Sequence, residues 1–191
     1  MPRTDILNSL KQAALRLRCD ARGASAVEFA FILPLMLTLL FGLVEVTTGV
    51  AADRKVTLTA RAISDVISQA SSITDTEITD SFAAISNVMS PFNTSTIKSV
   101  VSEVKINGSG QATVAWSKAN ANATARPVNS TVTIPSSLAV PNTYLIWSEV
   151  SYTYKSSIGW VIASAGINLN EQFFTRPRQS NCVLYGTSSC P

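Results

Sequence analysis

The sequence predicts an α+β fold, in which a long N-terminal helix, first transmembrane and then amphipathic, packs on an antiparallel sheet of about four strands. Near its N-terminus the chain has an almost uncharged stretch that is long enough to cross a bilayer. Several segments beyond residue 97 alternate between apolar and polar positions, which is typical of half-buried strands. The length of 191 residues suits one modest domain with appendages.

The composition excludes some classes of function. Charged residues make up 14% of the chain, against about a quarter in an average soluble domain. The net charge of +3 resides entirely in the first 22 residues, and the chain from Gly23 onward has no net charge. A basic excess directly before an apolar stretch is an orientation signal for membrane insertion. We therefore expect no nucleic-acid partner.

The apolar stretch predicts a transmembrane helix. Its core, Phe29–Val44, contains Thr38 as the only polar side chain, and Pro34 is expected to kink the helix or free one carbonyl. We expect a basic cytoplasmic leader over residues 1–23, a transmembrane helix over 24–52, an exported α+β domain over 53–178 and a tail over 179–191. The protein is thus expected to be a single-pass membrane protein in contact with lipid.

A cleavable signal peptide is the alternative interpretation. Such a peptide would be cut after Val50-Ala51-Ala52, before Asp53. Signal peptides have apolar cores of about 7–15 residues, and the stretch in this chain is longer and carries a glutamate at each end. These features favour the retained helix.

The helix is expected to continue beyond the membrane, to about Ala70. Apolar residues follow helical spacing there and form one stripe, made up of Val56, Ala60, Ile63, Val66, Ile67 and Ala70. Thr74 and Glu77 then predict a capping box that begins a second helix. That helix has its own apolar stripe, consisting of Ile78, Phe82, Ile85 and Met89, and ends before Pro91.

The remaining segments predict strands. Ile97–Asn107 and Gln111–Lys118 are joined by a Gly-rich turn at residues 107–110, which is a strong hairpin signal. A polar, proline-broken loop follows over Ala119–Pro141, with at most a short strand around Val132. Strands are also expected over Tyr144–Lys155 and Ile167–Thr175, whereas the apolar segment Ile158–Ala165 is ambiguous.

Nothing in the sequence predicts enzymatic chemistry. The chain has no histidine, so it lacks the commonest general base and metal ligand, and we expect no catalytic residue, no metal and no cofactor. Glu103, Glu149 and Glu171 occur one to each expected strand, which does not predict a carboxylate pair. A second set of candidates is aromatic and consists of Trp147, Tyr152, Tyr154 and Trp160. These residues could form a platform for a ligand, but the favoured interpretation is that they form part of the sheet core.

Cys182 and Cys190 lie close together near the C-terminus. If this part of the chain is exported to an oxidising compartment, the two are expected to form a disulfide. Two free thiols in a frayed tail are the alternative.

One acidic residue is unusually placed. Glu28 stands where the apolar stretch begins, and a carboxylate within a membrane segment costs about 2.5–3.5 kcal/mol. Arg22-Gly23, followed by Ala24-Ser25-Ala26-Val27-Glu28-Phe29, resembles a prepilin cleavage motif. With Phe after Glu, it resembles the motif of the tight-adherence (Flp-type) pilus system. Residues 148–154 and 174–178 are more loosely similar to the TadE-like proteins of that system.

The resemblance implies a pilin-like fold and a minor pilin or pseudopilin. It also implies the bacterial inner membrane as the location, with the 53–178 domain in the periplasm. A prepilin peptidase would cut between Gly23 and Ala24, Phe29 would complete the motif, and Glu28 would pair with the new amino group of a neighbouring subunit. The implied partners are that peptidase, other pilin subunits and the pilus assembly machinery. The alternative is a permanently membrane-anchored periplasmic module for binding or cell adhesion.

Overall fold

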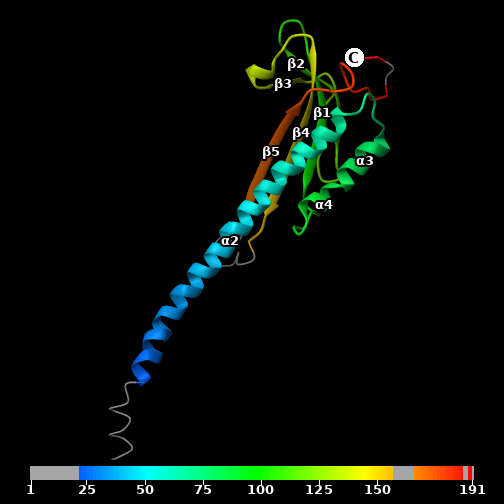
Figure 1. Ribbon diagram of the computed structural model, residues 1–191. Helices are drawn as coiled ribbons and strands as arrows, with labels where there is room; N and C mark the ends of the chain where they lie inside the picture. Colours follow the sequence, from blue (N-terminus) through cyan, green and yellow to red (C-terminus); the bar gives the residue numbers. More distant parts are fainter. Residues whose placement is uncertain (1–21, 157–165, 187–188, 191) are drawn as a thin grey trace, which may run out of the picture. The chain divides into compact units, whose positions relative to one another are not determined.

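The computed structural model describes residues 22–156, 166–186 and 189–190 (Figure 1). The ambiguous segment Ile158–Ala165 lies outside these residues. The chain divides into two compact units, Met1–Val46 and Thr47–Pro191, and helix α2 (Arg22–Ser68) continues from one into the other.

In the first unit, α2 presents apolar side chains all round. Every large apolar side chain between Val27 and Val46 is more than a third exposed. Pro34 lies inside the helix without ending it, and the Thr38 hydroxyl donates a hydrogen bond to the Pro34 carbonyl oxygen at 2.8 Å. By length and composition, α2 is the one helix among the described residues that is suited to cross a membrane. Apolar side chains on all faces suit lipid as the surrounding medium.

In the second unit, α2 has the predicted amphipathic stripe. Its fully or almost fully buried apolar residues recur at intervals of three or four, and they are Ala52, Val56, Ala60, Ile63 and Ile67. The prediction was wrong for Val66, which is 55% exposed. Val66 and Ile67 are neighbours in sequence, so they are about 100° apart around the helix, and only Ile67 faces the sheet.

The second predicted helix is divided in two. It forms α3 (Asp75–Ala83) and α4 (Ile85–Met89), which meet at Ala84. The capping box is present: the Glu77 N–H donates to the Thr74 hydroxyl, and the Thr74 N–H donates to the Glu77 carboxylate at 2.8 Å. Ile78, Ile85 and Met89 are buried, which confirms that this apolar stripe faces the core.

The sheet is antiparallel throughout and has the order β3-β2-β1-β4-β5. Its strands are β1 (Lys98–Ile106), β2 (Ala112–Ala119), β3 (Thr131–Val132), β4 (Thr143–Tyr154) and β5 (Ile167–Thr175). The two-residue β3 is the short strand expected around Val132, and it brings the number of described strands to five. In the β1–β2 turn, Gly110 has φ +82°, a left-handed conformation that glycine adopts readily.

The sheet has two differently covered faces. The inner face, formed by residues such as Val101, Ile146 and Val150, packs with the buried stripe of α2 and with α3 and α4. The outer face includes a second apolar cluster, in which Val104, Leu145 and Trp147 lie beneath part of the long 120–142 loop. In Figure 1, α2 runs along β4 and β5 in the second unit.

Two residues of the C-terminal segment belong to the core. Cys182 and Val183 have no exposed surface, and Leu184 forms a parallel bridge with Ser72, just before α3. The backbone N–H of Ile73 donates to the Leu184 carbonyl oxygen at 2.9 Å. Sequence analysis assigned this segment to a tail, because it is short, has polar flanks and shows no apolar periodicity.

We predict that Ile67→Ala lowers the free energy of unfolding by about 2–5 kcal/mol, because it opens a cavity between α2 and the sheet. Val66→Ala is the matched control, and it is expected to change stability by less than about 0.5 kcal/mol because Val66 is exposed. Denaturant titration of the full chain in detergent, followed by tryptophan fluorescence, measures both. Equal losses for the two variants would contradict this packing.

Candidate functional site

The motif residues all lie at the start of α2. Gly23, Ala24, Glu28 and Phe29 are exposed, and α2 begins one residue before Gly23. A Cβ added at Gly23 would meet no described atom within 4 Å, so packing against the described residues does not require glycine there. The reason for glycine must lie outside the packing of the described residues.

Glu28 follows Ala24 by four residues, and this spacing places both on one face of the helix. No ion pair in the described part of the chain includes Glu28. Its side chain is exposed in the described structure.

The structure joins Cys182 and Cys190 by a disulfide, with Cα atoms 5.9 Å apart. The bond closes a loop of the C-terminal segment on itself. It does not connect that segment to the helix or to the sheet.

The three glutamates of the strands do not come together as a carboxylate pair. Glu103 is fully buried and lies opposite Ile146, on the inner face. Glu149 lies opposite Val100, and its carboxylate is bound to Arg126. Glu171 pairs with Val150 on the edge strand β5. A hydrolytic site of two cooperating carboxylates is therefore not formed by these residues.

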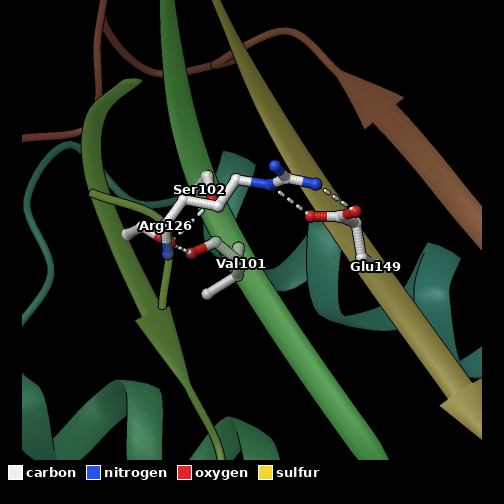
Figure 2. Close-up of polar contacts among 5 residues, drawn as sticks. Val101, Ser102, Arg126 and Glu149 are labelled. Atoms are coloured by element: carbon white, nitrogen blue, oxygen red, sulfur yellow. Dashed lines mark hydrogen bonds and ion pairs between the residues drawn. The ribbon is translucent and has the colours of Figure 1, made fainter. Parts of the chain in front are cut away.

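Arg126 links the long loop to the outer face of the sheet. Figure 2 shows its side chain reaching across β1 to Glu149 on β4, where two N–H groups donate to the carboxylate at 2.7 Å each. The guanidinium also lies 4.1 Å from the centre of the Trp147 ring. Hydrogen bonding to Glu149 raises the pKa of Arg126 above its already high value. The backbone N–H of Arg126 donates to Ser117 Oγ at 3.0 Å, so the loop is attached at two points.

Next to this ion pair, the outer face forms an open groove of about 660 Å³. Its lining comes from β1, the 122–127 loop, β4 and β5, and combines apolar surface with polar side chains such as Lys98, Asn122, Ser151, Asn170 and Gln172. This mixture suits a ligand that has both apolar surface and hydrogen-bonding groups.

The aromatic residues form core rather than a platform. Tyr152 and Tyr154 are buried within the inner-face cluster, and Trp147 is buried on the outer face, stacked on Phe174 at 5.3 Å. Trp160 lies outside the described residues. The described residues also contain no group of three or more Cys, Asp or Glu side chains placed to hold a metal ion.

The helix that contains the motif also matches a known protein family. Residues 23–64 match the family of TadE-like proteins. The match begins at Gly23 and ends within α2, so the strands lie outside it. No curated protein and no solved structure matches the chain.

The TadE-like match suggests a role in tight-adherence pilus systems and an association with pilus components. The family is in general non-enzymatic. Together with the apolar α2, the match fits a protein anchored in a membrane.

We predict that Arg126→Ala increases amide hydrogen exchange in residues 120–130 of the long loop and lowers the free energy of unfolding by about 1 kcal/mol, the upper range for a partly exposed ion pair. Lys98→Ala is the control, since Lys98 lines the same groove without an ion pair in the described structure. Exchange mass spectrometry of the full chain compares them. Unchanged exchange in the loop of the Arg126 variant would refute this anchoring role.

Proposed function

We propose that the protein is a minor pilin or pseudopilin of a tight-adherence pilus system. The observation that carries the proposal is the TadE-like match, which begins at Gly23, on a helix that is apolar on all sides before it enters a folded domain. In this arrangement residues 1–23 form a cytoplasmic leader and residues 24–52 span the inner membrane. Residues 53–178 form a periplasmic domain, which the 179–191 tail completes.

The proposal includes cleavage between Gly23 and Ala24 by a prepilin peptidase. Glycine leaves the backbone free of side-chain crowding, as a protease cleft requires. Cleavage creates an amino group at Ala24, one helical turn from Glu28 on the same face. Pairing of that group with Glu28 of a neighbouring subunit offsets the cost of keeping a carboxylate in the membrane.

We predict that the mature protein begins at Ala24 and that Gly23→Ala retains the leader. Gly42→Ala is the matched control: an added Cβ meets no described atom within 4 Å at either glycine, so both variants keep the packing of the described chain. Mass spectrometry of the N-terminal peptide of membrane-extracted protein distinguishes Met1 from Ala24. A wild-type protein that still begins at Met1 would exclude processing.

We further predict that Glu28→Ala protein is cut normally but is lost from assembled pili. The reason is that its neutral side chain no longer pairs with the amino group of another subunit. Glu28→Asp keeps the charge and is expected to retain part of the assembly. Immunoblots of sheared pili and of membranes measure both fractions. Normal assembly of Glu28→Ala would rule out pairing through this carboxylate.

A permanently anchored binding or adhesion module is the second candidate. The groove on the outer face favours it, because amide and hydroxyl groups lie there beside apolar surface around an open volume. An intact Met1, together with normal pili in the Glu28→Ala strain, would favour this module over the pilin.

A further inference from the structure

The most unusual polar group of the domain is the Glu103 side chain. It is fully buried at the centre of β1, where Trp116 of β2 and Ile146 of β4 lie opposite it. One carboxyl oxygen, Oε1, accepts a hydrogen bond from the backbone N–H of Val183 at 2.6 Å. The other, Oε2, is buried and has no hydrogen-bond partner in the described structure. An ionised carboxylate with one unpartnered oxygen is strongly disfavoured in such a place.

Glu103 is covered by residues 182–185, hereafter the latch segment. Val183 is held at both backbone groups, because its carbonyl oxygen accepts a hydrogen bond from Trp116 Nε1 at 2.8 Å. Leu184 bonds to the chain before α3, and its N–H donates to the Ser71 carbonyl oxygen at 3.0 Å. The Tyr185 ring lies 5.8 Å from the Trp116 ring, and its hydroxyl donates to Asp75 at 2.8 Å.

No described cation forms an ion pair with Glu103. From β4, the neighbouring titratable group is Tyr144, whose pKa is raised by burial and by the charge of Glu103. Lys105 lies two residues along β1 and pairs with Tyr144 in the register. The other charged groups around the latch segment are already paired with one another, namely Asp75 with Lys118, and Asp65 of α2 with Arg178. The charge on Glu103 therefore has no compensating partner among them.

Burial raises the pKa of Glu103 to about 7, against the opposing effects of the Val183 N–H and the Trp116 side chain. The ordinary value is 4.5. The state in which the latch segment covers Glu103, hereafter the closed state, therefore binds a proton more tightly than a state in which the carboxyl group is hydrated. Closure is fully favoured below about pH 4.5, weakens as the pH rises, and reaches its weakest level above about pH 7.

We propose that Glu103 and the latch segment form a pH-sensitive latch, in which protonated Glu103 keeps the segment seated and ionised Glu103 releases it. Ionisation requires water at Oε2, and the sheet closes off the carboxyl group on both sides through β2 and β4. Residues 182–185 belong to no strand of the sheet, so this cover can leave without breaking the sheet. This inference does not depend on the proposed pilus role.

The disulfide is compatible with such a release. Both of its cysteines belong to the C-terminal segment, so the bond ties the segment to itself and not to β1, β2 or α2. The latch segment can therefore leave the sheet while the disulfide stays intact. Release exposes the Trp116 ring and the Glu103 carboxylate together.

Hydrogen exchange of the full chain in detergent tests the latch. With exchange corrected for its intrinsic pH dependence, we expect the protection of residues 183–184 to fall on the order of tenfold between about pH 5.5 and about pH 8. Glu103→Gln, which stays neutral, is expected to keep its protection constant over this range. Glu171→Gln is the control, because it removes a carboxylate from β5 and is expected to follow the wild type.

Two results would overturn the latch. One is wild-type protection that does not change with pH, and the other is the same pH dependence in Glu103→Gln as in the wild type. If Glu103→Gln fails to fold, carbon-13 NMR of the wild-type Glu103 carboxyl group decides. A titration whose midpoint coincides with the loss of protection supports the latch, whereas an ordinary midpoint near 4.5 with unchanged protection excludes it.

Discussion

The domain depends on the close contact between the second half of α2 and the inner face of the sheet. Small residues allow it: the Ser148 hydroxyl donates to the Ala60 carbonyl oxygen at 2.6 Å, and the Ser64 hydroxyl donates to the Ile146 carbonyl oxygen at 3.3 Å. A helix normally satisfies its own backbone, so these extra bonds fix where the helix lies along β4. The apolar stripe around them then excludes water. α3, α4 and the C-terminal segment complete a core whose position this contact has set.

The two parts of the continuous helix α2 thus have different surroundings. Up to Val46 its apolar side chains are exposed on all faces, and from Thr47 onward one stripe is buried by the domain. In the proposed pilin, the first part packs among other helices in the membrane and the second part belongs to the periplasmic core. The TadE-like match covers both parts, from Gly23 to residue 64.

Sequence analysis predicted the elements whose signals are local. The capping box at Thr74, the turn at residues 107–110 and the strand Ile167–Thr175 were found because each depends on neighbouring residues or on a regular period. The burial of Glu103 and the Arg126–Glu149 pair were not predicted. Both depend on strand register and on loops that return from far along the chain, and a bulge after Glu103 shifts the register between β1 and β2. Within the candidate site, the sequence was sufficient to identify the motif at Gly23–Phe29. The groove and the latch segment could be identified only from the folded structure.

The most direct test of the central contact is to compare two truncated chains, residues 47–191 and residues 69–191. The first keeps the α2 stripe and the second removes it. We expect residues 47–191 to unfold cooperatively in denaturant, and residues 69–191 to lack a cooperative transition, because the inner face of the sheet loses its cover. If residues 69–191 fold as cooperatively and as stably as the longer chain, α2 is not the element on which the domain is built.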